Sequence, residues 1–132
     1  MASKKEISIT VELDDDNIPE KIDWNATDKE GEGIEDCKAM LLSIWDPEQQ
    51  DTLRLDLWTK EMTIDEMKVF FHQTLVTMAD TFQNATEEEA MAEDMRDFTS
   101  YFAEKMEIVE WLKEGLAKPF EILKQVQNDT FI

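Results

Sequence analysis

The side chain best suited to proton transfer is the single histidine, His72, which lies in the stretch VFFHQTL. General acid–base catalysis needs a partner within hydrogen-bond reach and a nucleophile to activate. Asp65 and Glu66 lie about two helical turns away, and no serine or cysteine falls at a spacing that would bring it near. A lone histidine bordering an apolar helical stripe is most often structural, so we favour that interpretation over catalysis.

The cysteine and the acidic clusters offer no stronger site. Cys37 is the only cysteine, so it can form no intramolecular disulfide and no cysteine metal cluster, and we interpret it as a small residue at the start of a strand. The acidic triplet 14–16 lacks the glycine and distal glutamate of a calcium loop and is interpreted as a solvated hairpin tip. The acids at 87–89 and 93–94 lack the Glu-x-x-His pairs of a di-iron bundle. Phosphate loops, zinc motifs and nucleophile elbows are also missing, so we expect no enzyme, no cofactor and no metal.

The charge balance restricts the class of partner. The 132 residues include 32 acids and 13 bases, a net charge of −19, which repels nucleic acid and anionic membranes and attracts a basic protein or a cation. The simpler interpretation of this charge is solubility. No apolar run approaches the roughly 18 residues of a membrane helix, and the first residues lack the apolar segment and cleavage site expected of a signal peptide. We expect a cytoplasmic protein that neither binds nucleic acid nor inserts into a membrane.

Alternating apolar residues in the first half predict antiparallel strands. Residues 7–13 alternate strictly, the stretch DDDNIPE breaks the pattern, and residues 20–26 resume it, which predicts a hairpin. The stretch CKAMLLSIWD is apolar at both parities, as in a strand buried on both faces or a short buried helix. We favour a strand, because the turn DPEQQD and the alternating TLRLDLWT follow it.

After Trp58 the period becomes helical. Residues 63–66 and 86–89 each form a capping box, a helix-start signature. Apolar stripes follow each box, first at Met67, Phe70, Phe71, Leu75, Met78 and Phe82, then at Met91, Met95, Phe98, Phe102 and Met106. The second stripe can extend through residues 108–112 before Gly115 and Pro119 end it. The predicted fold is α+β, a four-stranded antiparallel meander followed by a two-helix hairpin packed on one sheet face. It forms a single domain over 1–112, with a tail over 113–132.

The tryptophans are the most informative surface signal. Trp24 fits the core, whereas Trp58 lies opposite in parity to Leu53, Leu55 and Leu57 and should face away from the helices. Leu41 and Trp45 share that outer face if Leu42 and Ile44 point inward. An apolar patch on the open side of a sheet often marks an association surface, so Leu41, Trp45 and Trp58 are the candidate interaction patch. The alternative is that Trp111 or the tail covers it.

Long stretches of this chain resemble one known family. The segments ITVELDDDNIPEKIDWNATD, KAMLLSIWD and LRLDLWTKEMTIDEMKVFFHQTLVTMADTFQNAT closely resemble the GldC family of gliding-motility-associated proteins of Bacteroidetes, over roughly residues 7–106. The region after residue 106 is longer than the usual family ending. The resemblance implies a small soluble accessory protein that acts alongside envelope-bound motility proteins, and it brings no known active site.

Three functions follow from these observations. The first is a non-enzymatic accessory protein of gliding motility that works by protein–protein contact, with a homo-oligomer left open. The second is an acidic chaperone or adaptor for exported proteins, since four antiparallel strands followed by two helices are similar in outline to SecB export chaperones. The third is an enzyme that uses His72.

Overall fold

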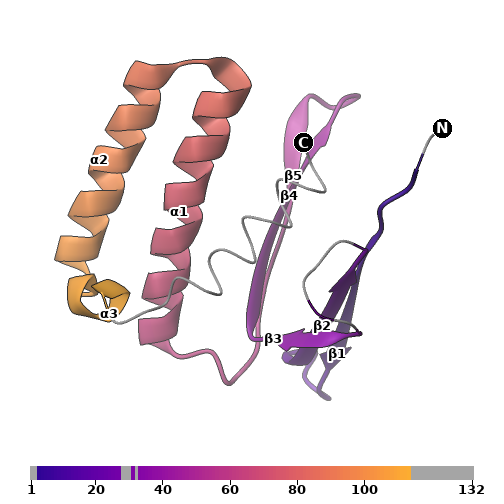
Figure 1. Cartoon of the computed structure of the whole chain (residues 1–132). Coiled ribbons are helices and arrows are strands. Elements are labelled where there is room, and N and C mark those ends of the chain that lie inside the picture. Colours follow the sequence, from indigo (N-terminus) through magenta and orange to yellow (C-terminus); the bar gives the residue numbers. More distant parts are fainter. Residues whose placement is uncertain (1–2, 28–30, 32, 114–132) are drawn as a thin grey trace. The chain divides into compact units, whose positions relative to one another are not determined.

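The computed structural model describes residues 3–27, 31 and 33–113, and it divides into two compact units that are considered separately. The unit Met1–Thr63 carries the strands, and the unit Ile64–Ile132 carries the helices (Figure 1). The α+β class, with antiparallel strands preceding two long helices, is confirmed. The single domain over 1–112 and the packing of the helices on a sheet face stay predictions. The tail lies, apart from Lys113, outside the described residues.

The first sheet contains β1 (Ile7–Leu13), β2 (Pro19–Ala26) and β3 (Glu35–Cys37), in the order β1-β2-β3. The predicted hairpin is confirmed, because β1 and β2 pair antiparallel with Ile9 opposite Trp24 and Val11 opposite Ile22. Directly paired residues lie on one face, so the alternating apolar residues of both strands share a face. Asn17 sits in the connecting loop at φ 62°, a conformation that asparagine tolerates better than most residues.

The prediction of one four-stranded meander is wrong, because the strands form two sheets. The stretch expected as a single strand from Cys37 onward is divided at Lys38 into β3 and β4 (Ala39–Asp46). The β3 strand pairs with β2, whereas β4 pairs with β5 (Asp51–Trp58) in a separate two-stranded sheet. The stretch is divided because its first residues pair with β2 and its later residues pair with β5.

The core of the strand unit is small. Ile22 is 0% exposed and Ala26 is 7% exposed, and Trp24 beside them is half-buried, as expected. Thr59 is also buried, just after β5, and its amide donates to the Lys38 carbonyl at 2.8 Å. This bond extends the β4–β5 ladder by one step beyond the Ala39–Trp58 pair.

The helical unit contains α1 (Ile64–Thr86), α2 (Glu89–Lys105) and the short α3 (Val109–Lys113). The first predicted start is confirmed, because α1 begins directly after Thr63. The second capping box is wrong, since the N-cap of α2 is Glu88 and makes no side-chain cap bond. Thr86 instead belongs to the end of α1, where its hydroxyl donates to the Phe82 carbonyl at 2.7 Å and accepts from the Glu88 amide at 3.2 Å.

Apart from Val69, the deeply buried side chains along α1 and α2 are small. Ala79, Thr77, Ala92, Thr99 and Ala103 are all at most 7% exposed. Small residues let helix backbones approach closely, so large side chains at the predicted stripes remain partly outside. Phe71, Met78, Met91 and Phe98 are each 42–54% exposed. An ion pair between Arg96 of α2 and Asp80 of α1, at 3.0 Å, joins the two helices.

The second helix ends earlier than predicted. The Ile108 amide donates to the Ala103 carbonyl at 3.1 Å, and the Glu107 amide donates to the Glu104 carbonyl at 3.2 Å. With Glu107 at φ 59°, this is a Schellman ending without the usual glycine. The turn brings Ile108 against Val69 and Ala103, and Trp111 of α3 packs on that cluster. No helix among the described residues is long and apolar enough to cross a membrane.

Candidate interaction surface

The β4–β5 hairpin has two chemically different faces. One face, which we call the Trp face, carries the directly opposed pairs Ala39–Trp58, Leu41–Asp56, Ser43–Arg54 and Trp45–Thr52. The other, which we call the aliphatic face, carries the pairs Met40–Leu57, Leu42–Leu55 and Ile44–Leu53. The register therefore places the candidate residues Leu41, Trp45 and Trp58 on one face. Their role as an interaction patch stays a prediction.

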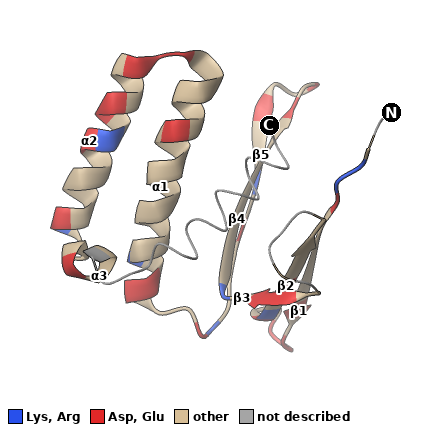
Figure 2. Ribbon diagram, viewed as in Figure 1, with Lys and Arg blue, Asp and Glu red and all other residues tan. Residues whose placement is uncertain are grey.

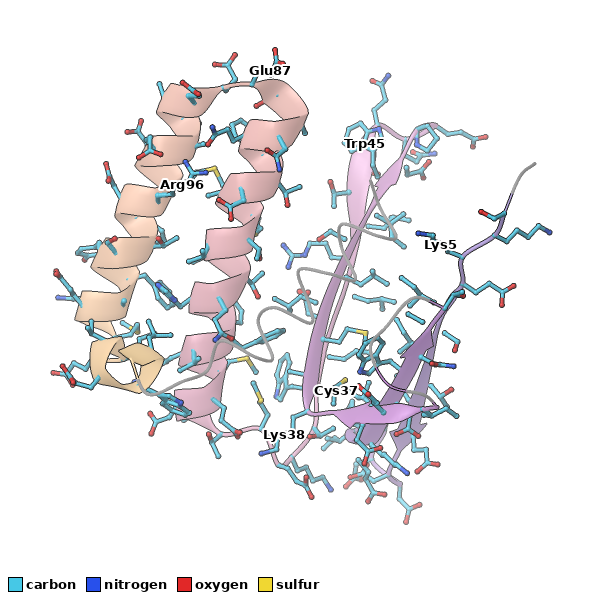
Figure 3. All side chains as sticks on the ribbon, in the orientation of Figure 1. Lys5, Cys37, Lys38, Trp45, Glu87 and Arg96 are labelled. Carbon is cyan, nitrogen blue, oxygen red and sulfur yellow. The ribbon has the colours of Figure 1, made fainter. Side chains whose placement is uncertain are left out.

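The three candidate residues do not form one contiguous cluster. Leu41 lies two residues from Ala39, the partner of Trp58, so Leu41 and Trp58 are diagonal neighbours. Trp45 lies four residues further along β4, about 13 Å away at the usual rise of a strand. Figure 3 shows Trp45 at one end of the strand and Lys38 beside the other. Trp45 is 62% exposed, Trp58 is 55% exposed and Leu41 is half-buried.

Charged groups separate and flank these apolar side chains. Between them, Arg54 Nη2 lies 3.1 Å from Asp56 Oδ1, with both side chains about half exposed, and such a pair contributes little stability. Beyond Trp45, Asp46 and Asp51 oppose each other directly and Glu48 lies in the turn between them. Figure 2 shows these acids in red at the turn end of the hairpin. By parity this acidic pair belongs to the aliphatic face. Like charges directly opposite each other are unfavourable, so the turn end of the hairpin favours a cationic neighbour.

The preference for a strand over a buried helix in residues 37–46 is confirmed for 39–46, but the expected burial on both faces is wrong. No residue of β4 or β5 is buried, and on the aliphatic face Ile44, Leu53 and Leu55 are 50–55% exposed. The sequence of β4 already indicated an apolar aliphatic face, because apolar residues occur at both parities of the strand. Trp111, considered as a cover for the patch, packs on the cluster of Val69, Ala103 and Ile108 in the helical unit. The tail, the other cover considered, lies outside the described residues apart from Lys113.

His72 occupies a packed position on α1. Its ring lies 6.2 Å from the Phe102 ring at 34°, and the side chain is half-buried. Burial lowers the pKa of His72, and a hydrogen bond with the Thr99 backbone partly opposes that shift. These neighbours supply no acid and no nucleophile, which favours the structural interpretation.

Cys37 lies at the end of β3, not at the start of a longer strand. It pairs with Ile22, whose side chain is fully buried, so the thiol lies on the apolar face of the first sheet. Burial raises the pKa of the Cys37 thiol. A raised pKa keeps the sulfur protonated and weakly nucleophilic at neutral pH. Cys37 and His72 also belong to different units.

Asp14 was expected to be solvated at a hairpin tip, and the structure shows a different role. Its carboxylate accepts hydrogen bonds from the Asp16 and Ile18 amides at 2.8 and 3.0 Å and pairs with Lys60 Nζ at 2.5 Å. Only 12% of the side chain is exposed. The contact with Lys60, followed by the two amide bonds, lowers the pKa of Asp14. Asp14 therefore links the β1–β2 loop to the chain after β5. Among the described residues, no three potential ligands of these types gather as a metal site.

Replacing Asp14 with asparagine is expected to lower the melting temperature at pH 7 more than Asp15→Asn, its exposed neighbour, does. Because pairing lowers the folded-state pKa, the stabilisation by the carboxylate is complete above the ordinary value of about 3.9. It is lost as the pH falls through the lowered folded-state pKa. Thermal denaturation is measured at pH 7 and in strong acid. The difference in melting temperature between the two variants should be smaller in acid. A difference independent of pH would contradict this role.

Sequence comparison identifies the family. Residues 19–108 match the family described as gliding motility-associated protein GldC-like, which covers more than half of the chain. The chain belongs to the GldC-like family. The resemblance derived from the residues is thereby confirmed, and membership associates the protein with gliding motility. Comparisons with curated proteins and with solved structures returned no match.

The GldC-like region spans most of the described elements. It begins at the first residue of β2, includes β3, β4, β5, α1 and α2, and ends at Ile108 in the turn after α2. Both faces of the β4–β5 hairpin therefore lie inside the matched region, and β1 and α3 lie outside it. The candidate interaction surface is thus part of the family domain.

Proposed function

We propose that this GldC-like protein is a non-enzymatic, cytoplasmic accessory protein of gliding motility that binds a protein partner through the Trp face. The observation that carries the proposal is the pair of half-exposed tryptophans, Trp45 and Trp58, on one face of a hairpin that lies inside the family domain. Tryptophan is enriched among residues that dominate binding energy at interfaces. The structural position of His72 and the raised pKa of Cys37 support a role without catalysis.

The chemistry of the partner follows from the spacing and the charges. An extended segment lying along the Trp face would place one apolar anchor near Leu41 and Trp58 and another near Trp45. A basic residue that reaches around the turn end of the hairpin would neutralise Asp46 and Asp51, which oppose each other on the aliphatic face. The negative field of the chain would speed the approach of such a segment and disfavour acidic competitors.

Replacing Trp45 with glutamate is expected to weaken partner binding on the order of 30-fold, because loss of a buried interface tryptophan costs about 2 kcal/mol or more. Trp45 lies on β4 and is more than half exposed in the free protein, so the fold should be unaffected. The measurement is cross-linking and affinity capture from gliding cells, with motility scored in parallel.

The matched control is Tyr101→Glu, which changes an equally exposed aromatic residue on α2. Tyr101→Glu should leave capture and motility unchanged. If Trp45→Glu and Trp58→Glu both recover the partner at the wild-type level, the Trp face is not the binding surface. His72→Ala should also leave motility intact, and loss of motility in a folded His72→Ala variant would support the enzymatic alternative.

The aliphatic face favours a second candidate, a chaperone or adaptor for exported proteins. Ile44, Leu53 and Leu55 leave about half of each side chain accessible to an unfolded apolar segment. Such a chaperone would suppress aggregation of an unfolded client at near-stoichiometric ratio, and Ile44→Asp would abolish the effect while Trp45→Glu would not. If the wild-type protein does not suppress aggregation of the client, binding of a dedicated partner is the favoured function.

A further inference from the structure

One edge of β5 is unpaired in the described part of the chain. The strand pairs with β4 along its whole length, and no second strand is hydrogen-bonded to it there. Residues 51–56 are all exposed, whereas β4 is half-buried from Ala39 to Leu42. An edge strand presents unpaired amide and carbonyl groups that can pair with another strand. A two-stranded sheet is also only marginally stable by itself.

The residues of β5 complement themselves in one antiparallel register. When Leu55 lies opposite Leu55 of a second copy, Arg54 faces Asp56 and Asp56 faces Arg54. On the other face of the strand, Leu53 then faces Leu57 in both directions. At the ends, Thr52 faces Trp58. Opposite charges and apolar pairs placed directly across an antiparallel ladder are stabilising.

Neighbouring registers lose this complementarity. Centring the two-fold axis on Arg54 places the two Arg54 side chains opposite each other, and centring it on Asp56 does the same for the two aspartates. Both arrangements oppose like charges, which is destabilising. A shift by one residue would place leucines of one copy on the charged face of the other. The axis through Leu55 is therefore the favoured register.

We propose that β5 is a dimerisation edge, at which two copies of this protein pair antiparallel about Leu55. The interface is isologous, as in most two-fold dimers, and it joins two β4–β5 hairpins into one four-stranded sheet. Within each chain Arg54 already lies 3.1 Å from Asp56, so the dimer would hold four charges of alternating sign. Both Trp faces would lie on the same side of the sheet. The proposal does not depend on the partner considered above.

Charge-reversed variants test this register directly. Arg54→Asp and Asp56→Arg each place like charges opposite each other in a homodimer, and self-association should weaken on the order of tenfold or more. An equimolar mixture of the two variants should restore a heterodimer, because every charge then faces its opposite. The mass is measured by sedimentation over a range of concentrations at about 0.15 M salt, where charges far from the interface are screened.

Two control variants distinguish an effect of the β5 register from a general effect of net charge. Lys4→Asp and Asp94→Arg make the same changes of charge at exposed positions outside β5 and should leave the dimer intact. A monomeric wild-type protein, dimers of both single variants with wild-type affinity, or a mixture that stays monomeric would each overturn the proposal.

A cross-link gives a readout that does not depend on the charges. In a Cys37→Ser background, Leu55→Cys should form a disulfide-linked dimer on mild oxidation, because directly opposed Cβ atoms lie about 4.5–5.5 Å apart. Leu53→Cys should not, since the two cysteines would be four residues out of register, about 13 Å. Equal cross-linking at positions 53 and 55 would contradict the register.

Discussion

Replacing Ile22 with alanine is expected to lower the free energy of unfolding by about 2–5 kcal/mol, the usual cost of truncating a buried isoleucine. Among the described residues, Ile22 is the largest side chain that is fully buried, at 0% exposure, and it lies where β1, β2 and β3 meet. Denaturant unfolding followed by tryptophan fluorescence measures the effect, because Trp24 lies two residues along the same strand.

Ile18→Ala is the matched control for this truncation. Ile18 lies in the β1–β2 loop and is 43% exposed, and its amide and carbonyl hydrogen bonds are retained in alanine. We expect Ile18→Ala to lower the free energy of unfolding by well under half as much as Ile22→Ala does. If both substitutions lowered the free energy of unfolding equally, Ile22 would not be the central residue of the core in the strand unit.

Enlarging Ala92 to leucine is expected to destabilise the helical unit by about 1–3 kcal/mol, because added methylenes in a packed interior force neighbouring side chains out of position. Ala92 of α2 and Ala79 of α1 are both 0% exposed. Hydrogen exchange of the α1 and α2 amides localises the effect to this unit.

Ala90→Leu provides the comparison, since Ala90 is exposed two residues earlier in the same helix. Alanine and leucine have similar helix propensities, so this change should be nearly neutral. A similar loss of stability for both variants would contradict the explanation that packing limits residue size at Ala92.

The type and bounds of most elements could be predicted from local spacing. The alternation at 7–13 matches β1, and the change of period after Trp58 precedes the start of α1 at Ile64. Two local features gave no usable signal. The strand β3 has only three residues and no apolar alternation, and the end of α2 places Glu107, not glycine, in the left-handed conformation.

The candidate surface was predictable only in part. Parity alone assigned Leu41, Trp45 and Trp58 to one face, because side chains alternate along a strand. The distance between Trp45 and the other two, and the Arg54–Asp56 pair between them, depend on which residue of β4 opposes which residue of β5. The role of Asp14 likewise depends on Lys60, which lies far along the chain.

The sequence by itself determined that antiparallel strands precede two long helices, that the chain is acidic and that it belongs to the GldC-like family. These properties follow from local spacing, composition and long matching stretches. Only the tertiary structure decided the separation into two sheets, the burial of small residues along the helices and, within the described ranges, the unpaired edge of β5. The physical reason is that periodicity records which way a side chain points. Pairing and burial instead depend on contacts between residues far apart in the chain.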